Sequence, residues 1–200
     1  VADLYFVGVA GDATEDAFRD DVEAARRVMD ERWGTEARSV VLVNNPRTLV
    51  AAPIATLTNL RDSLDEIGAA MDPDEDVAMV YVSTRGHPDG ALEMRMPPLE
   101  LVPITPALLR AAFDDAGIRY RIVVVSACHA GAFVDELADD DTAVIVASSS
   151  GHGSSGCDRG SVATAFGEAF FQRGMAKAAG LAEAFDLARA SVEERERSGN

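Results

Sequence analysis

One stretch near the middle of the chain constrains the fold more than any other. Residues 122–125 are four consecutive β-branched residues, which is typical of a strand buried on both faces in the middle of a parallel sheet. Small residues follow, and Gly131 permits a tight turn into a helix that we expect to run through Leu137. Cys128 therefore lies where a central strand ends. Open α/β sheets bind ligands there, so Cys128 is a candidate reactive residue, although a cysteine often packs only as a small hydrophobe.

Strands and helices alternate along the whole chain. Apolar runs predict strands at 4–10, 39–43, 77–82, 122–125 and 142–147. Helical spacing of apolar residues predicts helices near 18–33, 57–71, 105–113, 163–172 and 181–194. This alternation predicts an α/β fold with a mostly parallel sheet covered by helices on each side. Because right-handed crossovers place the strands' carboxyl ends on one edge, we expect the loops after the first, third, fourth and fifth strands to meet there.

Length and composition indicate a single soluble domain over residues 1–200. The chain has 200 residues, of which 48% are apolar, enough for a substantial core and too many for disorder. A net charge of −16 disfavours nucleic acid and anionic membranes as partners, since both attract clustered Lys and Arg. No apolar run is long enough for a membrane span. The chain begins at Val1 without Met, so a lost export signal or anchor, and with it a periplasmic or membrane-tethered location, stays open.

The sequence predicts no metal site and no cofactor. Cys128 and Cys157 are the only cysteines, too few for a disulfide framework and without metal-ligand spacing, and pairing between them stays open. Residues 151–156 match the G-x-G-x-x-G pattern of dinucleotide-binding folds. That pattern belongs in the first βα turn, whereas this loop follows the fifth strand and continues to Gly160. We expect a mobile rim of an active site instead.

Three histidines are expected at the same edge of the sheet as Cys128: His87, His129 and His152. His129 adjoins Cys128, and because side chains of adjacent residues usually diverge, it is a poor candidate for the base. His87 follows a buried strand and lies between Gly86 and Gly90, so it is better placed. The plainer interpretation is a turn histidine without a catalytic role. A thiol and an imidazole at neighbouring strand ends are the general arrangement for nucleophilic catalysis.

Several segments carry a resemblance to a known family. They are YFVG (5–8) with AGD (10–12), VNNPRT (43–48), MDPDED (71–76), SACHAG (126–131) and GC (156–157). In these segments the chain resembles the bacterial legumain-like cysteine peptidases, peptidase family C13, over nearly its whole length. The resemblance implies a caspase-like three-layer αβα sandwich, cysteine endopeptidase activity, and a peptide or protein as substrate. The oligomeric state stays open.

The resemblance also implies roles for residues around Cys128. The family's catalytic cysteine falls on Cys128, and its oxyanion donors are the backbone N–H groups of Cys128 and Gly86. The family's catalytic histidine position holds Arg85, which can stabilise a thiolate but cannot act as a base. His87, two residues further on, is the expected replacement. Another possibility is that Arg85 holds its loop or pairs with an acid such as Asp89.

The expected specificity pocket differs from that of the family. An arginine early in the first helix lines this pocket in legumain-like and caspase-like enzymes, and Arg19 matches it. The family's Asp-aromatic pair corresponds here to Val162 and Ala163. The resemblance therefore implies a net positive pocket and cleavage after Asp in preference to Asn. The changes at Arg85, Val162 and Ala163 also favour an alternative, a catalytically inactive homologue that binds peptides or partners through the same cleft.

Overall fold

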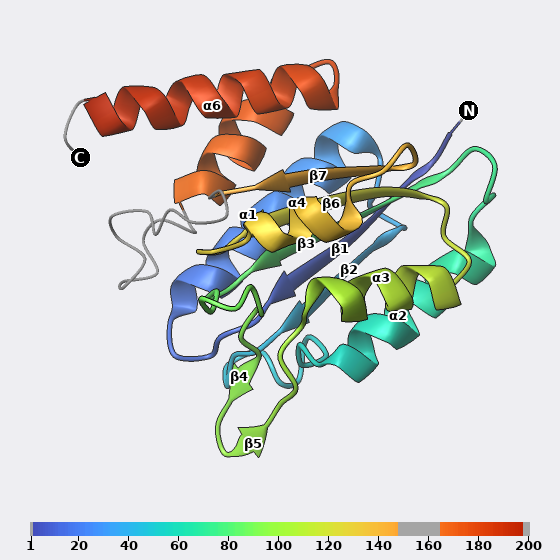
Figure 1. Ribbon diagram of the computed structural model, residues 1–200, viewed down its shortest axis with the longest axis vertical. Helices are drawn as coiled ribbons and strands as arrows, with labels where there is room; N and C mark the ends of the chain where they lie inside the picture. Colours follow the sequence, from blue (N-terminus) through green and yellow to red (C-terminus); the bar gives the residue numbers. More distant parts are fainter. Residues whose placement is uncertain (1, 148–164, 198–200) are drawn as a thin grey trace.

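The computed structural model describes residues 2–147 and 165–197, and it has the predicted α/β architecture (Figure 1). The elements in chain order are β1 (Leu4–Ala10), α1 (Asp16–Trp33), β2 (Ser39–Val43), α2 (Leu57–Ala70), β3 (Val77–Ser83), β4 (Arg95–Met96), β5 (Leu99–Glu100), α3 (Pro106–Asp115), β6 (Tyr120–Ser126), α4 (Gly131–Leu137), β7 (Thr142–Val146), η2 (Glu168–Met175) and α6 (Leu181–Arg197). The main sheet has five strands in the order β2-β1-β3-β6-β7. Every neighbouring pair in it is parallel.

The sheet separates two apolar cores, because successive side chains of a strand point to opposite faces. Val80 and Val82 of β3 lie in one core, where α2, α3 and α4 cover the sheet. Met79 and Tyr81 lie in the other, which α1, η2 and α6 cover. Figure 1 shows α2 and α3 below the sheet and α6 above it. The three layers place the strands' carboxyl ends at one edge, where the predicted chemistry lies.

Capping residues mark the ends of two helices. Gly34 ends α1 with φ 70°, and its N–H donates to the carbonyl of Met29, as expected for a left-handed C-terminal glycine. The Thr105 side chain accepts from the N–H of Leu108, and Pro106 follows at the first helical position of α3.

Two segments differ from the sequence prediction. The predicted strand 122–125 begins earlier, at Tyr120, because β6 pairs with β3 along seven residues. The second segment, 92–100, contains none of the strands predicted above, yet parts of it form β pairs. Leu92 is buried and forms bridges with Gly86 and Ile104, whereas only 95–96 and 99–100 form the hairpin β4–β5.

Candidate functional site

Backbone hydrogen bonds join the strand ends at the carboxyl edge of the sheet. The N–H of Gly11, just after β1, donates to the carbonyl of Ser83 at 3.1 Å, and the N–H of Thr84 donates to the carbonyl of Ser126 at 3.3 Å. The loops after β1, β3 and β6 therefore meet, as the sequence predicts. The loop after β7 begins at Ala147, and most of it, with His152, Cys157, Val162 and Ala163, lies outside the described residues.

Gly86 packs directly against the backbone of Cys128. A Cβ atom at position 86 would lie 1.7 Å from the carbonyl oxygen of Cys128 and 3.2 Å from its nitrogen, so no other residue type fits. Gly86 also lies opposite Leu92 in a β-bridge. Two hydrogen bonds flank this bridge: the N–H of His87 donates to the carbonyl of Ala91, and the N–H of Glu93 donates to the carbonyl of Arg85. Within the described residues, the Gly86 N–H itself donates to no acceptor. The structure thus brings together the two residues that the resemblance pairs as oxyanion donors.

Cys128 is half-buried in the turn between β6 and α4, and it is disulfide-bonded. Cys128 is therefore not a free thiol in this form. The sequence analysis left disulfide pairing open, and for Cys128 the structure shows a disulfide. The next residue, His129, has φ 55°, a left-handed conformation that is uncommon outside glycine. The expectation that His129 is a poor partner for Cys128 stays a prediction.

His87 lies in a tight turn beside Gly86. Its N–H donates to the carbonyl of Ala91 at 2.8 Å, and its own carbonyl accepts from Gly90 at 2.9 Å. The imidazole is half-buried and makes no hydrogen bond to a described residue. The backbone of His87 is thus fixed one residue from the Gly86–Cys128 contact, while its ring nitrogens keep their capacity to donate or accept.

Arg85 does not act on Cys128 through a free charge, because two carboxylates bind its guanidinium. Its Nε donates to Asp12 Oδ2 at 2.8 Å, and an NH2 group pairs with the carboxylate of Glu15. The guanidinium also lies over the ring of Phe18, 6.0 Å from its centroid. Pairing with an acid is thus confirmed, but Asp89 is the wrong acid, since its Oδ1 accepts from the N–H of Ala91 instead.

Arg19 lies on α1 in an acidic environment. Its guanidinium donates to Asp20 Oδ1 at 2.6 and 2.9 Å and to Asp16 Oδ1 at 3.2 Å. Asp16 also accepts from Asn45 at 2.7 Å and pairs with Arg47, and the hydrogen bond from Asn45 is the main cause that lowers the pKa of Asp16. Within the described residues, aspartates therefore balance the charge of Arg19, while Val162 and Ala163, on which the predicted net positive pocket also depends, lie outside them.

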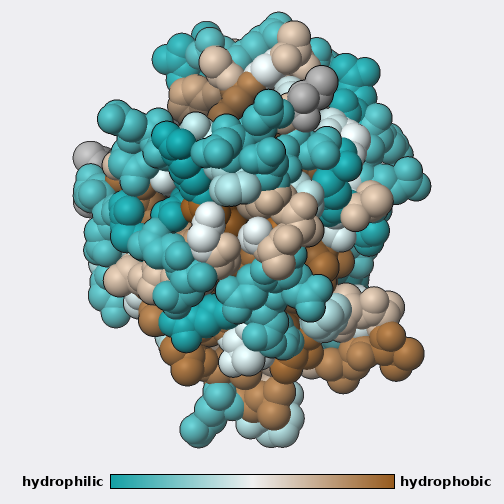
Figure 2. All heavy atoms as spheres, turned by 90° about the vertical axis from the view of Figure 1, so that its right-hand side faces the viewer, coloured by the Kyte–Doolittle hydropathy of each residue, from teal (hydrophilic) through white to brown (hydrophobic). Residues whose placement is uncertain are grey.

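Exposed apolar side chains lie near the same edge. Arg95 N–H donates to the carbonyl of Gly11 at 2.7 Å, which fastens the β4–β5 hairpin to the loop after β1. Figure 2 shows apolar atoms gathered at the lower end of the molecule, where Figure 1 places this hairpin and the loop after β2. The large exposed apolar residues of these two segments are Leu49, Val50, Leu99 and Val102.

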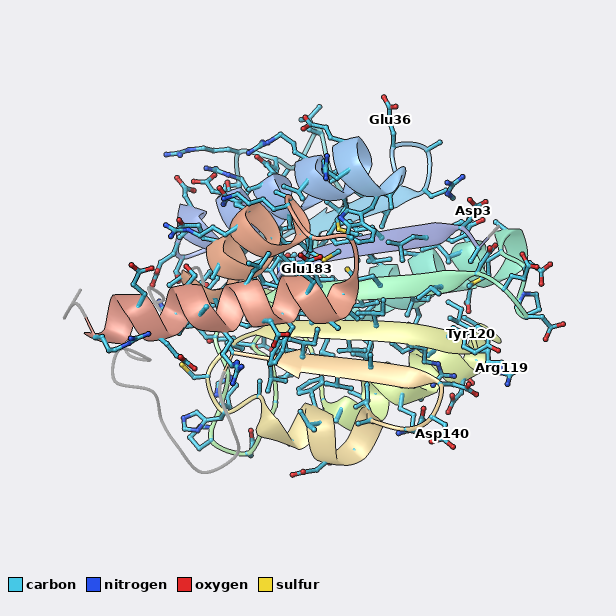
Figure 3. All side chains as sticks on the ribbon, turned by 90° about the horizontal axis from the view of Figure 1, so that it is seen from above. Asp3, Glu36, Arg119, Tyr120, Asp140 and Glu183 are labelled. Atoms are coloured by element: carbon cyan, nitrogen blue, oxygen red, sulfur yellow. The ribbon has the colours of Figure 1, made fainter. Side chains whose placement is uncertain are left out.

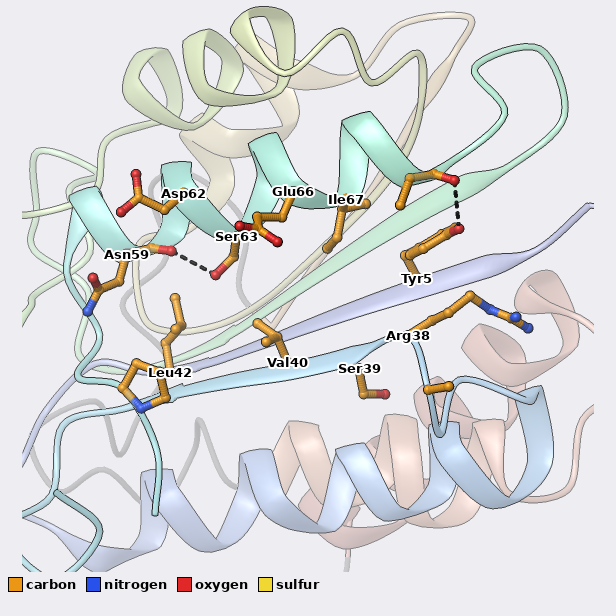
Figure 4. Close-up of a pocket in the computed structure, with 13 residues that line it drawn as sticks. Tyr5, Arg38, Ser39, Val40, Leu42, Asn59, Asp62, Ser63, Glu66 and Ile67 are labelled. Atoms are coloured by element: carbon orange, nitrogen blue, oxygen red, sulfur yellow. Dashed lines mark hydrogen bonds between the residues drawn. The ribbon is translucent and has the colours of Figure 1, made fainter. Parts of the chain in front are cut away.

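A cavity formed by described residues lies away from Cys128 and Gly86. It has a volume of about 430 Å³ and runs between β2 and α2, lined among others by Tyr5, Arg38, Leu42 and Glu66 (Figure 4). Neither Cys128 nor any other predicted site residue lines it. The amino end of the sheet, where Figure 3 labels Arg119 and Tyr120, holds surface ion pairs and is also remote from the site.

The described residues contain neither a cluster of metal ligands nor a helix that could span a membrane. Over 2–147 and 165–197, no three His, Cys, Asp or Glu side chains gather as metal ligands would. Nor does any helix of those ranges have the length and hydropathy needed to cross a bilayer.

A known protein family matches most of the chain. The model of the peptidase C13 family matches residues 66–199, a range that includes Arg85, Gly86, His87 and Cys128. No curated protein is significantly similar to the chain.

Proposed function

Because the chain belongs to the peptidase C13 family, whose members are cysteine peptidases, we propose that it is an endopeptidase with Cys128 as its nucleophile. The five-stranded parallel sheet between two layers of helices is the caspase-like fold of this family. The observation that carries the proposal is the packing of Gly86 on the backbone of Cys128. It brings the main chain of Gly86 against the main chain of a cysteine at the end of a central strand, and we propose that the N–H groups of these two residues form the oxyanion hole.

The proposed reaction begins with reduced Cys128. Its thiolate attacks the carbonyl carbon of the scissile peptide, and the oxyanion accepts hydrogen bonds from the N–H groups of Gly86 and Cys128. His87 takes the thiol proton and gives it to the leaving amine as the C–N bond breaks. Water then hydrolyses the thioester, with His87 as general base, and regenerates the thiol.

For the residue before the scissile bond we propose Asp or Asn, with Arg19 as the group that binds it. The Asp20 side chain is 62% exposed where it contacts Arg19, so a substrate carboxylate can displace it at small cost, since exposed ion pairs contribute about 0–1 kcal/mol. Asp16 then stays in place through Asn45 and Arg47. A peptide or protein is the proposed partner, and one domain over residues 1–200 is the proposed unit.

The alternative function is an inactive peptide-binding module. One observation favours it: Arg85, at the family's histidine position, is held by Asp12 and Glu15. A guanidinium held by two carboxylates stays protonated, so it cannot act as the catalytic base. In this alternative the protein surface beside Gly86 binds a peptide without cleaving it.

The deciding experiment measures hydrolysis of peptides with Asp, Asn or Ala before the scissile bond, in the presence of a thiol reductant. We expect turnover by the wild type, none by Cys128→Ala, and at least a ~10²-fold loss in His87→Ala, the low end of general acid–base help. His129→Ala, next to the nucleophile, is the matched control and should keep most activity. Wild-type turnover in His87→Ala with none in Cys128→Ala would refute the role of His87. Binding of peptide without turnover would favour the alternative.

A further inference from the structure

A buried carboxyl group lies under the candidate site and has no role in the proposed reaction. Asp21 of α1 is only 7% exposed. Its Oδ2 accepts from Ser83 Oγ at 2.8 Å and from the hydroxyl of Tyr81. Tyr81 and Ser83 are both fully buried on β3. No Lys or Arg of the described residues forms an ion pair with Asp21, so hydrogen bonds alone compensate a negative charge there.

A third segment packs on the same carboxyl group. A Cβ atom at position 167 would lie 2.2 Å from Asp21 Oδ1 and 2.2 Å from the Tyr81 hydroxyl oxygen. Gly167, which immediately precedes η2, therefore brings its backbone against the acid where any other residue would collide with it. Asp21 is thus the point at which α1, β3 and the start of η2 meet.

The surroundings of Asp21 favour its neutral form. Burial raises the pKa of Asp21 to about 7, with a smaller contribution from the charge of Glu168, while the hydrogen bonds from Tyr81 and Ser83 oppose the rise. Burial and the neighbouring Asp21 raise the pKa of Tyr81 well above its ordinary value, so Tyr81 stays protonated. Tyr81 on β3 and Glu168 on η2 are the titratable groups that face Asp21. Of the hydrogen-bonded pair Asp21 and Tyr81, it is Asp21 that changes charge near pH 7.

Two of the three segments lead directly to the candidate site. Ser83 is the last residue of β3, and the chain continues through Thr84 and Arg85 to Gly86. On α1, Arg19 precedes Asp21 by two residues. A change in the packing of Asp21 therefore acts on the oxyanion side and on the proposed substrate-binding side together.

We propose that Asp21 is a proton-controlled positioning residue, whose ionisation sets how α1 and the Gly167 backbone pack against the end of β3. The neutral acid fits the buried site, and the carboxylate, once formed, draws water or loosens the packing because a buried charge without a cation is costly. The inference rests on the proposed function for its effect on catalysis. The protonation itself does not depend on that function.

The test compares Asp21→Asn with wild type from pH 5 to pH 8. Asparagine keeps the shape and still accepts from Tyr81 and Ser83, but it cannot ionise. We expect the melting temperature of the wild type to fall as the pH rises from 5 to about 7 and to level off above that, and that of Asp21→Asn to lack this fall. Glu31→Gln, which changes an exposed acid on the same helix, should behave as wild type. Parallel curves for wild type and Asp21→Asn would overturn the proposal.

A second readout separates positioning from a merely structural role. In the Cys157→Ser background, with Cys128 reduced, we expect the pH profiles of Cys128 alkylation and of peptide turnover to change shape in Asp21→Asn and to stay unchanged in Glu31→Gln. Changed melting curves with unchanged site profiles would overturn the positioning role. Absence of turnover in every variant would count against the peptidase proposal alone, because melting and alkylation still report on Asp21. Should Asp21→Asn not fold, carboxyl NMR titration of the wild type decides, and a pKa below 5 would overturn the inference.

Discussion

Arg85 donates a hydrogen bond from Nε to Oδ2 of Asp12 at 2.8 Å, and the Asp12 side chain is completely buried. The pair links the end of β3 to the loop after β1 across 73 positions of sequence. Because Asp12 Oδ1 also accepts from the N–H of Thr14, the carboxylate fixes both loops. Arg85, which the resemblance places at the family's histidine position, is therefore a cation that holds two loops together.

Replacing Arg85 by histidine should first cost stability. Breaking a buried ion pair leaves its partner uncompensated, at about 3 kcal/mol for Asp12, and we expect Arg85→His to lower the free energy of unfolding by about that much. Arg85→His with Asp12→Asn should recover part of the loss, and Arg85→Lys, which keeps the charge, should lose less. Chemical denaturation of the three variants measures this.

The same variant separates the two functions. If His87 serves as the base, turnover per folded Arg85→His molecule should change little. A gain of ~10²-fold, the low end of restored acid–base catalysis, would instead indicate a lapsed peptidase whose nucleophile is intact. Turnover has to be measured at a temperature where the melting curve shows the variant folded.

Gly86→Ala should remove activity and destabilise the protein, because the added Cβ would lie 1.7 Å from the Cys128 carbonyl oxygen. The loss of an aligned oxyanion donor typically costs about 10²- to 10³-fold in kcat. Gly180→Ala is the matched control, since a Cβ there meets nothing within 4 Å. Equal turnover of the two variants would argue against Gly86 as an oxyanion donor.

Reduction should control the reactivity of Cys128, since the residue is disulfide-bonded in the structure. Without reductant, iodoacetamide should leave Cys128 unmodified and peptide turnover should be absent. After reduction we expect Cys128 to be alkylated before Cys157, because Cys128 lies at the end of a central strand, where open α/β sheets bind ligands. Mass spectrometry of a time course identifies the first site. Earlier modification of Cys157 would remove the main support for Cys128 as nucleophile.

Arg19→Ala should abolish any preference for Asp before the scissile bond while leaving the nucleophile intact. The variant also frees Asp20 and removes one of the two cations on Asp16, so the site becomes more acidic and acidic substrates should lose kcat/KM most. Arg47→Ala, which removes the other cation on Asp16, is the control for that charge effect. A substrate library profile dominated by Lys or large apolar residues in both wild type and variant would contradict the assignment of Arg19.

Local sequence signals predicted the sheet and its helices well. The apolar runs at 4–10 and 39–43 coincide with β1 and β2, because strands covered by helices on both faces exclude polar residues. The start of β6 was missed because Arg121 is charged. Its guanidinium lies over Phe113 and pairs with Asp114, so a polar residue occupies a strand position at the rim of the core.

The polar contacts of the site could not be predicted in the same way. Arg85 and Glu15 are 70 positions apart, and Tyr81 and Asp21 are 60 apart. No periodicity in the sequence relates such pairs, since only the strand order brings them together. The one available signal was local: Asp12 and Glu15 follow the first strand, at the edge where the resemblance places the site. These two acids are the feature of the sequence from which ion pairing of Arg85 could have been predicted.

Asp21 provides a pH dependence of stability that does not rely on any activity. The ordinary pKa of an aspartate is 3.8, whereas that of Asp21 in the folded protein is about 7, so between these values the native state holds a proton that the unfolded state has lost. The free energy of unfolding should therefore fall as the pH rises from 4 to 7 and level off above that. At 1.36 kcal/mol per pKa unit, the contribution lost is on the order of 4 kcal/mol. The difference between wild type and Asp21→Asn in urea denaturation at pH 4, 5.5, 7 and 8 isolates it, and a difference that does not vary with pH would mean that Asp21 is ionised throughout.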